Sequence, residues 1–204
     1  MSMRRLPLLV LPLLFAVAAC GSDSNTPVAS GDPTSTTTST IAPVTTAVPT
    51  ETCSTAGIRV TLADQDLPDA VAAKRKAIFD AAVACDYDAL GKLVGPQFNY
   101  TFGDATGGPA AYWKSQEDAG QPVMKSLVQV LNLPNVARQQ PEGGAKYTSW
   151  PSADQDVRTQ ADWDALKGVY SDEQVAAFQK DDLYTGYRVA ITDSGDWMYF
   201  VAGD

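Results

Sequence analysis

The chain has 204 residues, of which 45 % are hydrophobic, and it carries a formal net charge of −9 with no histidine. This size and hydrophobic content are typical of one globular domain. The missing histidine excludes His-containing catalytic triads and the common His-ligated zinc sites. The acidic charge argues against binding to nucleic-acid phosphates.

Residues 1–19 have the three parts of a secretion signal. Arg4 and Arg5 form the positively charged start, residues 6–17 are mostly apolar, and two alanines precede Cys20. The apolar stretch is shorter than the about 20 residues that a transmembrane helix needs. The pattern therefore predicts export and removal of this segment.

The residues around the cleavage site, Val17 to Gly21 (Val-Ala-Ala-Cys-Gly), resemble the lipobox of bacterial lipoproteins. The resemblance implies that a peptidase cuts before Cys20 and that Cys20 receives a diacylglyceryl group carrying palmitate-like chains. Because each buried CH₂ is worth about 0.8 kcal/mol, two or three chains would hold the protein firmly on the extracytoplasmic face of the cell membrane. The alternative is an ordinary signal peptide that leaves Cys20 unmodified.

The segment that follows, within residues 20–52, has the composition of a spacer. Thr, Ser and Pro supply 19 of the 32 residues from position 21 to 52, and none is aromatic. Such a segment buries too little apolar surface to offset its ordering entropy, which predicts a disordered tether. Extended, it would reach on the order of 100 Å. A passive spacer and an O-glycosylated stalk both fit this composition.

Residues 53–204 read as a single α+β domain. Pro68, Pro109 and Pro122 each open a helical pattern, and Ser171 with Gln174 fits a capping box. The expected helices cover residues 68–84, a short stretch after Asp86, stretches opened by Pro109 and Pro122, and residues 159–168 and 171–180. The expected strands cover residues 58–62, 98–102, 146–150, 183–192 and 197–202. We therefore expect several helices packed on a small, mostly antiparallel, curved sheet that ends in a C-terminal β-hairpin.

Cys53 and Cys85 are the two cysteines of this domain. In an exported protein such a pair is expected to form a disulfide. Closing a loop of about 33 residues would stabilise the fold by roughly 3–4 kcal/mol. Two buried free thiols are the alternative.

Residues 81–90, followed by aromatic residues from Phe98, resemble the opening of cone-shaped domains related to nuclear transport factor two. The Gly195-Asp196-Trp197 run is similar to the last strand of that family. The resemblance implies a curved sheet and helices around a pocket, used for binding or as an active site. Extra helices and the lack of a His–Asp pair depart from the family pattern, so the resemblance carries over no catalytic residue.

Polar-tipped aromatic residues are numerous, and Tyr100, Tyr184 and Arg188 are the candidate ligand-binding residues. Small neighbours, Gly186 and Ala190, would leave room for Arg188 to pair with a ligand carboxylate. An Arg188 on the solvent side of an antiparallel strand is the alternative.

The sequence predicts no catalytic constellation, no cofactor and no metal site, since the acidic residues near the C-terminus lack a calcium-loop spacing. We therefore expect a membrane-anchored extracytoplasmic binding or interaction module of the cell envelope, with an envelope protein, a glycan or a small ligand as partner. The alternatives are a hydrolase-like envelope enzyme that uses carboxylates and tyrosines, and a structural spacer. Aromatic rings in an exposed patch would favour a protein partner or a glycan. Rings around a cavity with a pKa-shifted carboxylate would favour an enzyme, and rings wholly in the core would favour the spacer.

Overall fold

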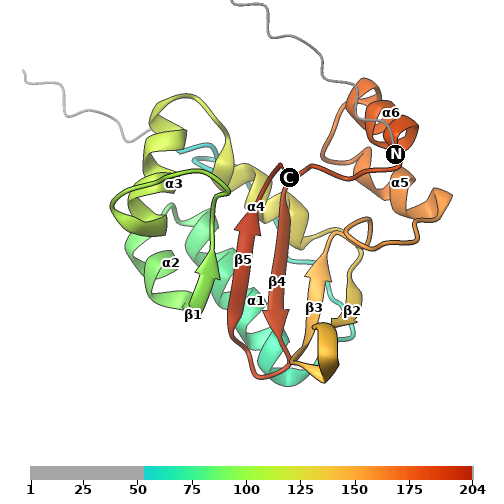
Figure 1. Ribbon diagram of the computed structural model, residues 1–204. Coiled ribbons are helices and arrows are strands. Elements are labelled where there is room, and N and C mark those ends of the chain that lie inside the picture. The colour runs from blue at the N-terminus through green and yellow to red at the C-terminus, as the bar shows by residue number, and fades with distance from the viewer. Residues whose placement is uncertain (1–52, 204) are drawn as a thin grey trace, which may run out of the picture. The chain divides into compact units, whose positions relative to one another are not determined.

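The computed structural model describes residues 53–203, which form helices and one sheet (Figure 1). The helices are α1 (Asp69–Val83), α2 (Tyr87–Leu93), α3 (Gly108–Asp118), α4 (Val123–Leu131), the 3₁₀-helix η1 (Pro141–Gly143), α5 (Gln160–Leu166) and α6 (Asp172–Asp181). The strands are β1 (Val94–Asn99), β2 (Val136–Gln139), β3 (Lys146–Trp150), β4 (Arg188–Thr192) and β5 (Trp197–Val201). The predicted α+β class is confirmed. The predicted signal peptide, Cys20 and the tether lie outside the described residues.

The strands form one sheet in the order β1-β5-β4-β3-β2. The pairs β2–β3, β3–β4 and β4–β5 are antiparallel, whereas β1 runs parallel to β5. This last pairing needs a glycine, because a Cβ on Gly95 would lie 2.7 Å from the carbonyl oxygen of Trp197. The mostly antiparallel sheet and its C-terminal hairpin, β4–β5, match the prediction.

The helices begin at the capping residues that the sequence predicts. Pro68 and Pro122 are the N-cap residues of α1 and α4, and the side chain of Asp86 caps α2 by accepting a hydrogen bond from the Ala89 N–H. Ser171 forms the expected capping box of α6. A second capping box, at the start of α5, went unpredicted because it pairs Thr159 with an aspartate rather than with Glu or Gln.

Residues 58–62 form no strand, which corrects the first strand prediction. The side chain of Asn132 holds this segment in place of a neighbouring strand. Its Oδ1 accepts a hydrogen bond from the Ala63 N–H at 2.8 Å, and its amide donates to the Thr61 carbonyl at 3.2 Å. This segment is therefore tied to the end of α4 rather than to a strand.

The second strand prediction is displaced, since β1 ends at Asn99 rather than Phe102. Phe98 packs on Trp197 with ring centroids 4.7 Å apart. Phe102, which alternation placed on the same face, is 52 % exposed. Gly95-Pro96 belongs to β1, as proline tolerates an edge strand.

Two further strand boundaries differ from expectation. β4 begins at Arg188 rather than Leu183, because the Tyr187 N–H donates to the Tyr170 hydroxyl at 2.8 Å instead of joining the sheet. Strand β2 was not predicted, since its four residues are too few to show a period.

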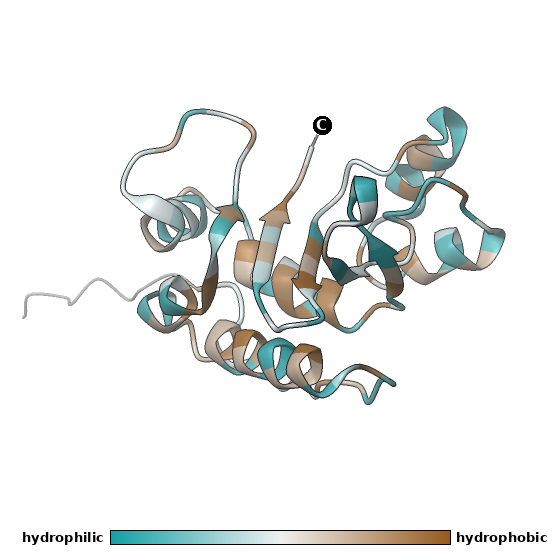
Figure 2. Ribbon diagram, turned by 60° about the horizontal axis from the view of Figure 1, so that its bottom comes forward, coloured by the Kyte–Doolittle hydropathy of each residue, from teal (hydrophilic) through white to brown (hydrophobic). Residues whose placement is uncertain are grey.

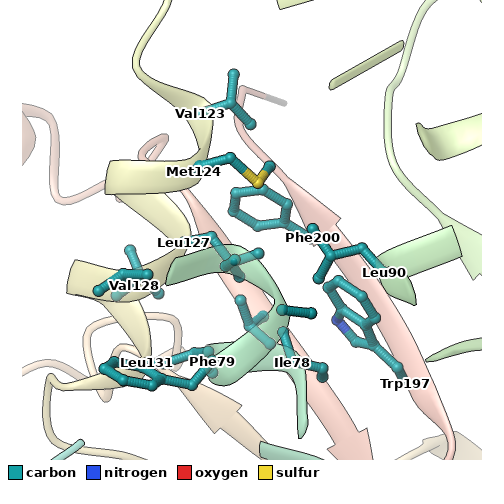
Figure 3. Close-up of a cluster of buried hydrophobic side chains, with 14 of the residues drawn as sticks. Ile78, Phe79, Leu90, Val123, Met124, Leu127, Val128, Leu131, Trp197 and Phe200 are labelled. Atoms are coloured by element: carbon teal, nitrogen blue, oxygen red, sulfur yellow. The ribbon is translucent and has the colours of Figure 1, made fainter. Parts of the chain in front are cut away.

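Helices α1 and α4 cover one face of the sheet (Figure 1). Figure 3 shows Met124 and Leu127 of α4 beside Phe200 of β5, and Ile78 of α1 on the side of Trp197. Figure 2 shows hydrophobic residues concentrated on the central strands. The buried members of this main core are Val71, Ile78, Phe79, Ala81, Ala82, Tyr87, Leu90, Trp113, Val123, Met124, Leu127, Val128, Val130, Leu131, Trp150, Val189, Ile191, Trp197 and Phe200.

A second, smaller core lies under α5 and α6. Its buried members are Leu133, Ala153, Trp163, Leu166, Val175 and Tyr184. Val169, Tyr170 and Phe178 pack against it and are partly exposed. No helix within residues 53–203 is long and apolar enough to span a bilayer.

The N-terminal segment of the domain is fixed to the helices by a disulfide and by buried side chains. Cys53 and Cys85 are joined, as the sequence predicts. Beside them, the Thr55 hydroxyl donates to the Ala82 carbonyl at 2.9 Å. Further along, the buried guanidinium of Arg75 donates to the carbonyls of Leu131 and Ala63, which ties this segment to both α1 and α4.

Glu117 is the buried acid that completes this attachment. Its side chain is 5 % exposed and accepts hydrogen bonds from the Ser54 N–H at 2.6 Å and the Ser54 hydroxyl at 2.7 Å. It also accepts from the Met124 N–H at 2.6 Å, one of the donors that the first turn of α4 leaves unpaired. One carboxylate thus joins the N-terminal segment, α3 and α4.

We expect Glu117→Ala to lower the free energy of unfolding by about 3 kcal/mol, because it leaves buried N–H groups without an acceptor. Urea denaturation measures the loss. Asp118→Ala is the matched control on the same helix, since the Asp118 side chain is 51 % exposed and its ion pair with Lys114 lies at the surface. That variant should stay within about 0.5 kcal/mol of the parent. Equal losses in both variants would contradict this role of Glu117.

Candidate ligand-binding cleft

Partly exposed aromatic rings gather around two adjoining pockets at one end of the sheet. We call the two pockets together the aromatic cleft. The smaller, of about 60 Å³, and the larger, of about 350 Å³, share Tyr187 and Ala202. The partly exposed rings of the cleft are those of Tyr100, Tyr112, Tyr170, Phe178 and Tyr187.

Five separate parts of the chain place these rings. Tyr100 follows β1 and lies against Tyr112 of α3, with ring centroids 5.5 Å apart. Tyr187 precedes β4 and stacks on Phe200 of β5 at 5.0 Å. On the other side of the cleft, Tyr170 precedes α6 and its ring packs on that of Phe178, with centroids 5.5 Å apart. The cleft therefore lies where the main core and the smaller core meet.

A chain of hydrogen bonds fixes the wall between the two cores. The Tyr184 hydroxyl donates to the Tyr187 carbonyl at 2.6 Å. Its one proton is thereby used, so the Tyr170 hydroxyl, 3.0 Å away, is the donor in the contact between them. The Tyr170 oxygen in turn accepts from the Tyr187 N–H. Tyr170 and Tyr184 thus serve the fold, and neither has a proton left for a ligand.

The turn at this wall requires a glycine. A Cβ on Gly186 would lie 2.4 Å from the Tyr170 hydroxyl and 2.6 Å from the Tyr184 hydroxyl. Because both hydroxyls are held by hydrogen bonds, neither can withdraw to make room. Gly186 was noted in the sequence as room beside Arg188, but the rings of two tyrosines fill that room.

Tyr187 presents a different kind of hydroxyl to the cleft. It forms no hydrogen bond within residues 53–203. Burial raises the pKa of Tyr187 to about 12, and the neighbouring Tyr112, Tyr170 and Glu117 add to the shift. The hydroxyl therefore stays protonated at neutral pH and is able to donate and accept a hydrogen bond.

The other lining residues are hydrophobic, small, hydroxylated or amide-bearing, and none is charged. They are Thr101, Trp113, Val123, Phe200, Gln174, Ala177, Thr185 and Gly186, with the shared Ala202. All four tryptophans of the chain are at most 6 % exposed. The aromatic surface of the cleft therefore comes from tyrosine and phenylalanine.

The three candidate residues from the sequence lie in different surroundings. Tyr100 lines the smaller pocket of the cleft. Tyr184 is 1 % exposed and belongs to the smaller core. The Arg188 guanidinium donates to the Tyr184 carbonyl at 3.2 Å and to the Gly203 carbonyl at 2.6 Å, which ties the C-terminal end to β4. The structure thus joins Tyr184 and Arg188 and places Tyr100 with Tyr112.

A polar network around Asp154 covers part of the other face of the sheet. Its Oδ2 accepts from the Ser149 hydroxyl at 2.7 Å and from the Tyr199 hydroxyl at 3.0 Å. The guanidinium groups of Arg138 and Arg188 lie 3.8 and 4.0 Å from its oxygens. Burial first, and the Asp154 charge second, raise the pKa of Tyr199. The network attaches the loop after β3 to the sheet.

A groove of about 320 Å³ also lies beside Tyr199, between β1 and the β2–β3 turn. Its lining includes the carboxylate of Asp196 and one partly exposed aromatic ring, that of Tyr199. It therefore lacks the converging rings of the aromatic cleft. Within residues 53–203, no three His, Cys, Asp or Glu side chains gather as metal ligands.

Comparisons of the chain with protein-family models, curated proteins and solved structures found no match. The resemblance to domains related to nuclear transport factor two stays a prediction from the sequence.

Sequence reasoning missed Tyr112, Tyr170, Phe178 and Tyr187 as members of one site. Tyr112 and Tyr187 were noted as polar-tipped aromatics, but nothing in the spacing of either pairs it with the other. Tyr170 reaches the cleft because its hydroxyl accepts from the Tyr187 N–H, and Phe178 follows because its ring packs on those of Tyr170 and Tyr184. The available signal was Gly186, whose place between two tyrosines indicates close packing of rings.

We expect alkaline conditions to unfold the domain through its buried tyrosines. The pKa of Tyr187 is raised above its ordinary value of 10, so its stabilising effect is complete below pH 10 and is lost as pH rises toward about 12. Tyr170, Tyr184 and Tyr199 are shifted in the same direction. Urea denaturation at a series of pH values measures the fall.

Tyr187→Phe removes one of the groups that cause this fall. The variant should match the parent at pH 7 within about 0.5 kcal/mol, because the hydroxyl has no partner in the fold. Its free energy of unfolding should then decrease less than that of the parent above pH 10. An identical decrease in parent and variant would contradict a pKa of Tyr187 that is raised by its surroundings.

Proposed function

We propose that the chain is a lipid-anchored binding module on the extracytoplasmic face of the cell membrane, and that its folded domain receives an envelope ligand in the aromatic cleft. The observation that carries the proposal is the cleft itself, with rings from five parts of the chain and an accessible Tyr187 hydroxyl without a partner. Concave, largely apolar sites with a few polar groups are typical of ligand binding.

The N-terminal sequence supports the membrane location in this proposal. An acylated Cys20 would hold the protein at the membrane without a basic patch, which suits the acidic chain. The spacer predicted within residues 20–52 would carry the domain away from the lipid. Because the disulfide fixes Cys53 to α1, the domain would be held at one defined point.

The chemistry of the cleft favours binding over catalysis. A general base works best with a pKa near the operating pH. The tyrosines Tyr170 and Tyr187 are shifted the opposite way, so they remain neutral hydrogen-bonding groups at pH 7. Such groups fix the orientation of a ligand more readily than they move its protons.

The anchor is tested by Cys20→Ala in the full chain. We expect the parent in the membrane fraction and the variant in the soluble exported fraction, because the acyl chains are the membrane attachment. Immunoblotting of the two fractions measures the distribution. A variant that stays with the membrane would overturn the lipid assignment.

The cleft is tested by tyrosine nitration of the full chain, once in intact envelopes and once after purification. If an envelope ligand occupies the cleft, Tyr100, Tyr112 and Tyr187 should be nitrated several-fold more slowly in the envelope. Peptide mass spectrometry gives the extent at each residue. Tyr147, partly exposed on β3 and outside the cleft, is the internal control and should react alike in both. Equal reactivity of all four would contradict a ligand in the cleft.

A further inference from the structure

The polar groups around the aromatic cleft share one chemistry, which narrows the class of ligand. They are hydroxyls and one amide, from Thr101, Thr185, Gln174 and the cleft tyrosines. Hydroxyls donate and accept hydrogen bonds, and an amide offers both functions side by side. A ligand rich in hydroxyl groups can exchange hydrogen bonds with each of these polar groups.

The absence of charge in the lining argues against an ionic ligand. A charged group that enters a cleft without a counter-charge loses hydration and gains no ion pair. The chain also has a net charge of −9, which repels anionic polymers. The lining therefore suits a neutral ligand.

The rings supply the second half of the recognition. A sugar ring has an apolar face of C–H groups and a rim of hydroxyls. The tyrosines combine an apolar ring face with a polar tip, so they contact both parts of such a ring at once. The larger pocket, of about 350 Å³, is near the lower end of the roughly 300–1,000 Å³ typical of ligand sites, which fits a short stretch of sugar.

Tyr187 occupies the centre of this arrangement. It lines both pockets, and the smaller one holds Tyr100 and Tyr112 while the larger one holds Phe178. A ligand that extends from one pocket into the other must pass the Tyr187 ring. Its hydroxyl has no partner in the described residues, whereas that of Tyr170 is committed to the wall.

Resting on the binding function proposed above, we infer that the aromatic cleft binds a neutral sugar chain of the cell envelope, with sugar rings packed on the cleft aromatics and a sugar hydroxyl hydrogen-bonded to Tyr187.

The test uses the full chain, purified in detergent, with neutral tetrasaccharides of glucose, mannose, galactose or N-acetylglucosamine as probes. Isothermal titration calorimetry measures the dissociation constant. We expect at least one of these saccharides to bind. Tyr187→Phe should weaken that binding about three- to tenfold, the effect of one lost hydrogen bond. Tyr112→Ala with Phe178→Ala should abolish it, because the ring faces are gone.

Two controls separate the cleft from other causes. Tyr147→Phe alters a tyrosine outside the cleft and should leave the dissociation constant unchanged. The cationic, deacetylated form of the N-acetylglucosamine tetrasaccharide should bind no better than the neutral one, since the cleft lining offers no charge. Tyr187→Phe removes only a hydroxyl without a partner, so it remains folded and keeps the test valid even where the double variant does not.

Each remaining outcome overturns the inference. Saccharide binding that Tyr187→Phe and the double variant leave intact would place the sugar elsewhere. Binding of a peptide with the proline-containing sequence of residues 27–49, with no saccharide bound, would make the occupant a peptide. If no probe binds while cleft tyrosines are protected from nitration in the envelope, the sugar assignment fails and the binding function stands. If neither binding nor protection is seen, both fail.

Discussion

The hydrogen bonds among Tyr170, Tyr184 and Tyr187 are the interaction on which the shape of this domain depends. The first two belong to the region of α5 and α6, and the third leads into β4. These bonds are partly buried beside the smaller core, where an unmade bond would leave a polar group unsatisfied at a cost of about 1 kcal/mol or more. They therefore hold two hydrophobic cores at a fixed separation, and the aromatic cleft is the space that this separation leaves.

The hydrogen bonds that attach the N-terminal segment also reach the aromatic cleft. Glu117 accepts from the Met124 N–H, and Val123, the preceding residue, lines the smaller pocket of the cleft. The carboxylate also holds Ser54, next to the disulfide of Cys53. The point at which the predicted spacer would enter the domain is thus tied to the helices that support the cleft. In the proposed function, the anchor and the binding site would therefore share one framework.

The tyrosines of the domain divide into two groups by what surrounds their hydroxyls. Tyr184 and Tyr199 are held by carbonyl, hydroxyl or carboxylate oxygens and stiffen the fold. Tyr187 is half-buried with its hydroxyl unused within the described residues. Such a hydroxyl has already lost part of its hydration, so a ligand that supplies a partner gains more from the bond than it would at a fully exposed group. This difference, rather than the number of tyrosines, points to the cleft.

Local signals were sufficient for much of the fold. Pro68, Pro122 and the Ser171 box placed three helix starts, because a cap depends on residues within one turn of each other. Two cysteines in the domain of a chain predicted to be exported were enough to pair Cys53 with Cys85. The strand predictions failed where a group distant in the sequence forms the backbone hydrogen bonds. At residues 58–62, the Asn132 side chain bonds to the backbone of Thr61 and Ala63 in place of a neighbouring strand.

By itself, the sequence determined the α+β class, the helix starts and the disulfide, since each rests on a short run of residues or on composition. The address at Cys20 stays a prediction from the same kind of signal. Only the tertiary structure decided which aromatic residues meet. Tyr100, Tyr112, Tyr187 and Phe178 are brought together by the packing of α3 and α6 at the same end of the sheet, and no spacing along the chain encodes that. The tertiary structure also decided that Arg188 donates to two backbone carbonyls and that Tyr184 lies in the smaller core. Both side chains are donors that lie away from water, so each bonds to an acceptor that the fold brings near.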